Sequence, residues 1–159
     1  MPAGICILGF GSPHGDDQAG WQVVKMLQRH TKLGAVVRAA KDPLQLIDLD
    51  QAYEALIIVD ACSAAGDAGT ISRIQWPDVR IRSQHGHSSH SVSVAEALFL
   101  ADQINRLPER VVLFGIETGE CSPASAISDA VASALPALEQ QILQEVHELE
   151  CLRSQAKKE

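Results

Sequence analysis

Three short apolar runs constrain the fold of this chain most, at residues 5–10, 55–59 and 111–116. Runs of this length, rich in β-branched residues, are typical of strands that are buried on both faces of a parallel sheet. Segments with apolar residues at three- and four-residue steps, which is typical of covering helices, lie between and after these runs. The alternation predicts an α/β fold, a three-layer α/β/α sandwich with a mostly parallel, five-stranded sheet.

Local signals predict the remaining elements. We expect a strand over 35–40, an edge strand over 70–76, and helices over 16–30, 43–49, 92–104 and 127–149. Asp42 and Pro43 are typical of a helix start, as N-cap and first helical residue. Pro136 lies inside the last predicted helix and removes a backbone donor, so a kink or a break into two helices is expected there.

Length and composition narrow the class of protein. The 159 residues are enough for one ordinary domain, which we expect over 1–152, with a frayed tail over 153–159. A net charge of −7, with only 13 Lys and Arg, argues against a nucleic-acid surface. No apolar run is long enough to span a membrane and no signal peptide is evident, so a cytoplasmic protein is expected. The four cysteines show no close pairing, so we expect them to be reduced, and we expect a monomer.

Asp17, Asp60 and His90 are the candidate site residues. Asp60 ends the apolar run 55–59, Asp17 follows the glycine-rich loop after the first run, and His90 follows a long polar loop and precedes a helical pattern. Sites in open α/β sheets form beyond the carboxyl ends of the strands, so we expect these three residues to meet in one crevice. Two carboxylates and an imidazole suit Zn²⁺, Ni²⁺, Mn²⁺ or Fe²⁺, and three protein ligands would leave positions open for a substrate atom or water.

Several neighbours compete for these roles or reach the same edge. Asp16 is an alternative to Asp17, since a helix start also favours carboxylates that merely interact with its dipole. His85 and His87 are alternatives to His90, although both could equally be solvated loop residues. The remaining candidates are Glu117 and Glu120, as rim or solvated residues, Cys62, which we expect to be structural, and His14, to which the sequence assigns no role.

The order and spacing of several motifs resemble the hydrogenase maturation proteases. The motifs are Ile-Leu-Gly-Phe-Gly-Ser at 7–12, Asp-Asp-Gln-Ala-Gly at 16–20, Leu-Ile-Ile-Val-Asp-Ala at 56–61, Ser-Ser-His at 88–90, Ala-Glu-Ala-Leu at 95–98, Arg-Leu-Pro at 106–108, the run 111–117 and Ser-Pro at 122–123. The loop before Asp17 differs from the family pattern, because it is one residue shorter than usual and has Ser12 where asparagine is common.

This resemblance implies an endopeptidase that removes the C-terminal extension from the large-subunit precursor of a nickel-iron hydrogenase. It also implies that Asp17, Asp60 and His90 are both the metal-contacting and the catalytic residues, and that the metal is nickel carried by the precursor. Whether this nickel only marks the completed precursor or also activates the scissile bond is left open by the sequence. Two other functions remain possible from the residues alone, a non-catalytic docking module for hydrogenase assembly and a general metallopeptidase with its own zinc.

Overall fold

The protein has a central five-stranded sheet in the strand order β2-β1-β3-β5-β4. The computed structural model describes residues 4–49, 52–63, 66–78, 92–119 and 125–159. The strands are β1 (Ile5–Phe10), β2 (Val36–Ala40), β3 (Ala55–Cys62), β4 (Ile71–Gln75) and β5 (Arg110–Glu117). All neighbouring strands are parallel except β4, which pairs antiparallel with β5 at the edge. The predicted α/β class, with a mostly parallel sheet and an edge strand near residue 70, is therefore confirmed.

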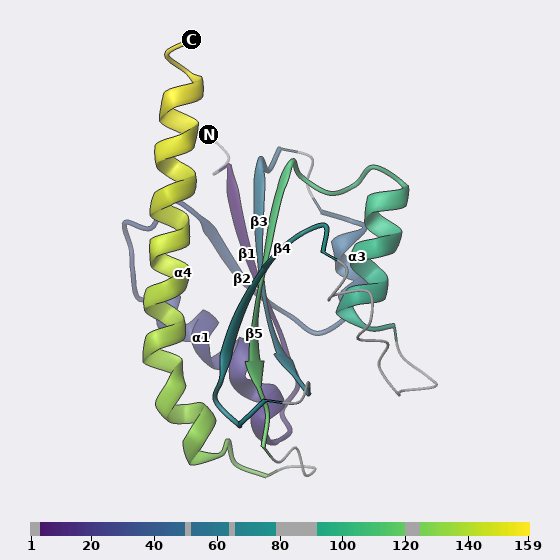
Figure 1. The fold of residues 1–159 in the computed structure, drawn as a ribbon, viewed down its shortest axis with the longest axis vertical. Coiled ribbons are helices and arrows are strands. Elements are labelled where there is room, and N and C mark those ends of the chain that lie inside the picture. The colour runs from purple at the N-terminus through teal and green to yellow at the C-terminus, as the bar shows by residue number, and fades with distance from the viewer. Residues whose placement is uncertain (1–3, 50–51, 64–65, 79–91, 120–124) are drawn as a thin grey trace.

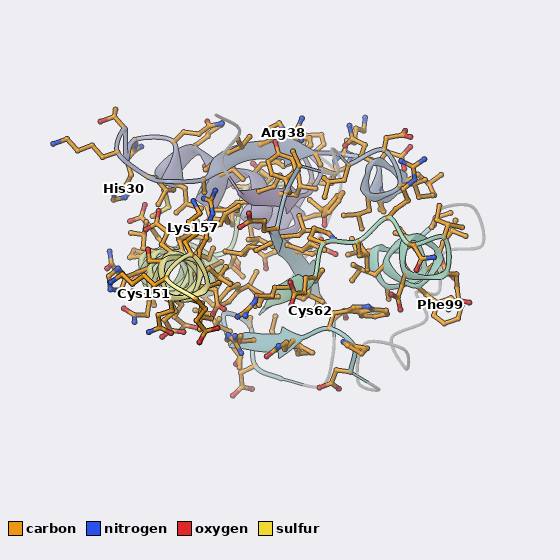
Figure 2. All side chains as sticks on the ribbon, turned by 90° about the horizontal axis from the view of Figure 1, so that it is seen from above. His30, Arg38, Cys62, Phe99, Cys151 and Lys157 are labelled. Carbon is orange, nitrogen blue, oxygen red and sulfur yellow. The ribbon has the colours of Figure 1, made fainter. Side chains whose placement is uncertain are left out.

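Helices cover both faces of the sheet and complete three layers (Figure 1). The helical elements are the 3-10 helix η1 (Gly15–Gln18), α1 (Ala19–Leu27), the 3-10 helix η2 (Pro43–Leu46), α3 (Val94–Gln103) and α4 (Asp129–Ala156). Figure 2 shows α4 on one side of the sheet and α3, with Phe99 pointing outward, on the other. The carboxyl ends of the parallel strands form the lower edge in Figure 1, and α1 and the first turns of α4 lie at that end.

The alternation of side chains along the strands divides the core into two halves. In β3, Ile57 and Val59 pack with α1 and α4, whereas Leu56 and Ile58 pack with α3 and η2. All four side chains are fully buried. Residues at even positions of β3, including Asp60 beyond Ile58, therefore face the α3 side of the sheet.

β1 and α1 approach each other so closely that glycine is required on both. A β-carbon at Gly9 would collide with the Gly20 carbonyl oxygen, and one at Gly20 would collide with the Phe10 carbonyl oxygen. Two backbones can come this near only where neither residue has a side chain. The contact fixes the start of α1 against the end of β1, and η1 lies between these two elements.

The predicted helix starts are largely confirmed, with tighter geometry than expected. The segment predicted as one helix over 16–30 begins as the 3-10 helix η1 and continues as α1. The predicted N-cap Asp42 accepts a hydrogen bond of 2.9 Å from the Leu44 backbone N–H, although η2 is a 3-10 helix. α3 begins with a capping box between Ser93 and Glu96.

Of the two alternatives predicted at Pro136, the break is wrong, because α4 is one helix from Asp129 to Ala156, and the kink stays a prediction. Pro136 is exposed, and so is Ala132, whose carbonyl would have accepted the missing hydrogen bond. Water can satisfy that carbonyl, so the helix continues through the proline.

The helix also extends into the segment predicted to be frayed, where Arg153 forms an ion pair of 2.9 Å with Glu54. Within the described ranges, no helix has both the length and the apolar character needed to cross a membrane.

Candidate active site

Asp60 lies near the carboxyl end of β3, paired in register with Gly115 of β5. Its side chain is half-buried and faces the α3 side of the sheet. Burial is the main cause that raises the pKa of Asp60 from 3.8 to about 8, and the negative charge of Asp17 raises it further, against a smaller opposing effect of the Ala61 backbone. Without a cation nearby, Asp60 therefore retains its proton at neutral pH.

Asp17 is the third residue of η1, the turn that joins β1 to α1. Its backbone N–H donates to the His14 carbonyl at 3.1 Å, and its carbonyl accepts from the Ser12 N–H at 3.2 Å. η1 contacts β3, and the charge of Asp17 acts on the pKa of Asp60. The structure thus brings Asp17 and Asp60, which are 43 positions apart in the chain, to the same edge of the sheet.

The imidazole of the predicted cluster lies outside the described residues. His90 falls within 79–91, as do the alternatives His85 and His87, and Glu120 falls within 120–124. Among the residues that the structure describes, no group of three or more His, Cys, Asp or Glu side chains is arranged to hold a metal ion. The metal-binding and catalytic roles of Asp17, Asp60 and His90 remain predictions.

Asp16 and Asp17 lie in different environments, although they are adjacent in the chain. Asp16 is 0% exposed, and its carboxylate accepts hydrogen bonds from the Gly119 N–H at 2.7 Å, the Ser128 N–H at 2.7 Å and the Ser128 hydroxyl at 2.9 Å. The Asp17 side chain is only half-buried. A carboxylate whose oxygens already accept protein hydrogen bonds is poorly placed to bind a ligand, so Asp17 is the better candidate of the two.

Other residues at this edge differ from their sequence-based interpretation. Glu117, for which surface solvation was one expectation, is only 8% exposed, and its backbone forms hydrogen bonds with Gly69 and Thr70. The Cys62 side chain packs against Gly115, and its Sγ is 3.1 Å from the position that a β-carbon at Gly115 would occupy. His14 is exposed, and its carbonyl supports η1.

The cysteine prediction can be followed for three of the four residues. Cys6, Cys62 and Cys151 form no disulfide in the described part of the chain. Cys121 lies outside it. Burial raises the pKa of the Cys6 thiol, which fits its expected role as a small apolar core residue.

A cavity of about 340 Å³ lies at the opposite edge of the sheet, near the start of β1 and the end of α4. Its charged side chains are of both signs, and Glu54 and Arg153 are ion-paired. The charge of Glu54 is already compensated by Arg153, whereas Asp17 disfavours ionisation of Asp60, so a cation would stabilise the Asp17–Asp60 edge more. The carboxyl edge is therefore the better candidate for chemistry.

Comparisons with known proteins give the family. The model of the hydrogenase maturation protease family matches residues 21–145. The chain belongs to the hydrogenase maturation protease family. No curated protein matches in a sequence search.

Solved structures of hydrogenase maturation proteases have the same fold as this chain. The maturating endopeptidase HybD from E. coli is similar with a TM-score of 0.75 and 20% identity over 93% of each chain. The NiFe hydrogenase maturation protease HycI from Thermococcus kodakarensis is similar with a TM-score of 0.71 and 17% identity, over 90% of this chain and 92% of that one. At these identities the likeness shows the fold, and the family match identifies a maturation endopeptidase.

Proposed function

We propose that this protein removes the C-terminal extension from the nickel-loaded large-subunit precursor of a nickel-iron hydrogenase. In this proposal Asp17, Asp60 and His90 contact the nickel, which arrives as part of the precursor. The observation that carries the proposal is the approach of two carboxylates at one sheet edge, in a chain of the maturation protease family. The reaction takes place in the cytoplasm, with the protease acting as a monomer.

The electrostatics of the acid pair favour a positively charged ligand. Among the described residues, the charged group that acts on the pKa of Asp60 is Asp17, and its effect is to disfavour ionisation. A divalent cation between the two carboxylates would reverse this effect, because opposite charges favour the ionised form. Binding of precursor nickel would then release the proton from Asp60.

The donor set supports nickel that belongs to the substrate. Two carboxylates and one imidazole form a site of moderate affinity, whereas the cysteine thiolates that the family resemblance implies for the precursor would hold nickel more firmly. We therefore expect the purified protease to contain little metal. The cluster would then test whether a precursor is complete, and nickel at the site could also polarise the scissile carbonyl as a Lewis acid.

The test compares cleavage of purified precursor made with and without nickel, followed by mass spectrometry of the released extension. Wild-type protein should cut only the nickel-loaded precursor, and His90→Ala should remain folded without cutting. His147→Ala, which changes an exposed histidine on α4, is the matched control and should cut normally.

Three results would contradict this proposal in different ways. Equal cutting of nickel-free precursor would remove the sensing role, and normal cutting by His90→Ala would remove the assigned ligand. Tight binding of loaded precursor without any cutting would instead favour a docking module. Cleavage of unrelated peptides by protein that purifies with zinc would favour a general metallopeptidase.

A further inference from the structure

We propose that Asp16 is a positioning residue that acts through Asp17. It ties η1 to the β5–α4 connection, residues 118–128, of which 118, 119 and 125–128 are described. By this tie it holds the Asp17 carboxylate in place beside Asp60. The inference rests on the proposed function, because it assigns Asp16 a role in the same cleavage reaction.

The contacts of Asp16 reach both described ends of this connection. One carboxylate oxygen, Oδ2, accepts from the Gly119 N–H just after β5 and from the Ser128 hydroxyl just before α4. The other oxygen, Oδ1, accepts from the Ser128 N–H. The same Ser128 hydroxyl oxygen caps α4 by accepting from the Val131 N–H at 3.4 Å. A single buried carboxylate therefore joins the end of β5, the start of α4 and η1.

The residues on either side of Asp16 and Asp17 are attached to the same connection. The Gly15 N–H donates to the Ser125 carbonyl at 3.0 Å, and the Gln18 side-chain amide donates to that carbonyl at 3.1 Å. The printed backbone bonds of Asp17 go to Ser12 and His14 instead. Gly15, Asp16 and Gln18 thus attach η1 to this connection. Asp17, whose charge acts on Asp60, depends on these three neighbours for its position.

Asparagine at position 16 cannot reproduce these contacts. Each oxygen of Asp16 accepts from a backbone N–H, so the amide nitrogen of asparagine would face a donor in either orientation. A buried donor left without an acceptor is costly, and η1 would shift to relieve the conflict. Because catalytic groups misplaced by about 1 Å can lose roughly 100-fold in rate, a small shift of Asp17 is sufficient for a large effect.

The experiment measures cleavage of nickel-loaded precursor by Asp16→Asn and Ser128→Ala at a temperature where circular dichroism shows each variant to be folded. We expect a kcat loss of about 10- to 100-fold for Asp16→Asn and a smaller loss for Ser128→Ala, which leaves the two backbone donors in place. KM should rise as well, because the displaced Asp17 also contacts the nickel of the bound precursor in the proposed function.

Glu145→Gln is the matched control for general destabilisation. Glu145 is also buried, and its carboxylate accepts two hydrogen bonds from Arg73, but it lies on α4 away from η1. Glu145→Gln should lower the melting temperature of the protein and leave kcat for precursor cleavage unchanged. Equal kcat losses in folded Asp16→Asn and Glu145→Gln would overturn the inference.

Two further measurements separate positioning from a structural role. Asp17→Glu already displaces the carboxylate at position 17 by one methylene, so Asp16 has little correct positioning left to support in that variant. Adding Asp16→Asn to Asp17→Glu should therefore lower kcat by at most about a further 3-fold. The full loss in both backgrounds would overturn the inference. Amide hydrogen exchange gives a readout without cleavage, since the Asp17 N–H should exchange faster in Asp16→Asn and unchanged exchange would contradict the positioning.

The proposed function and this inference fail in different ways. If wild-type protein does not cut loaded precursor, the proposed function fails before any variant is compared. If wild-type protein cuts and folded Asp16→Asn cuts equally well, only the positioning role fails.

Discussion

Asp60 is half-buried and Glu145 is buried, and their surroundings have opposite effects on a negative charge. Glu145 on α4 accepts hydrogen bonds of 2.7 and 2.9 Å from the Arg73 guanidinium of β4, so its charge is compensated. Asp60 has Asp17 as its charged neighbour, and its pKa is raised to about 8. The Glu145 carboxylate joins α4 to the edge strand β4, whereas the Asp60 carboxylate destabilises the fold when it is ionised. The comparison teaches that the stability of the isolated chain does not explain the acid at the end of β3, whereas the proposed contact with a cation would.

Replacing Asp60 tests this contrast with the largest expected effect. Asp60→Asn should lower the cleavage rate of nickel-loaded precursor by about 100- to 1000-fold, because in the proposed function the ionised Asp60 contacts the nickel at the reacting centre. The same variant should be at least as stable as wild type at pH 8, since no buried carboxylate must ionise. Cleavage assays and urea unfolding check the two parts, and a clear loss of stability at pH 8 would make Asp60 a structural residue like Glu145.

The pH dependence of stability follows from the raised pKa of Asp60. In the folded chain Asp60 keeps its proton up to about pH 8, whereas in the unfolded chain it loses the proton near pH 3.8. The folded state therefore binds more protons between these values, and its stability falls as the pH rises through this window. We expect a loss of about 2 kcal/mol between pH 5 and pH 8 from this residue, less than the full shift implies because the side chain is partly exposed.

Urea unfolding of the metal-free protein at several pH values checks this expectation. The control is Asp60→Asn, in which this part of the pH dependence should be absent. A variant whose stability falls with pH as steeply as that of wild type would show that another group is responsible.

Removing the compensated acid should have the reverse outcome of Asp60→Asn. Glu145→Gln should destabilise the protein by about 1–2 kcal/mol, because it removes the ion pair with Arg73. The loss stays this small because the Arg73 side chain is 43% exposed, so water can solvate its charge. Cleavage by the folded protein should stay within about 2-fold of wild type. Thermal unfolding measures the first effect, and a large loss of cleavage at full folding would end the contrast between the two acids.

Cys62→Ser should have the smallest effect. Cys62 lies two positions beyond Asp60 on the same strand, but neither its spacing nor its surroundings indicate a nucleophile. Cleavage within about 2-fold of wild type is expected, because the hydroxyl is a close replacement in size. Abolished cleavage by a folded Cys62→Ser variant would place the cysteine in the reaction.

The fold and the position of two of the three candidate site residues follow from local sequence patterns. The apolar run that ends at Asp60 predicts β3, and the rule for carboxyl ends of parallel strands correctly places Asp17 and Asp60 at one edge. The contacts of Asp16 could not be predicted, because its partners Gly119 and Ser128 are more than 100 positions away. Glu145 was missed for the same reason, since its partner Arg73 lies on β4. The predicted break at Pro136 failed because the sequence does not show which side of a helix faces water.

The order of the strands has a consequence for synthesis of the protein. β3 lies between β1 and β5, so Ala55 is paired with Ile5 on one side and Arg110 on the other. Pairings between such distant parts of a chain form slowly, because closing the loop between them costs entropy. A ribosome that has released only the first hundred residues has produced β1 and β3 without β5, and without the Gly119 and Ser128 groups that bind Asp16. The nascent chain therefore cannot assemble this arrangement around η1 until Ser128 has left the ribosome.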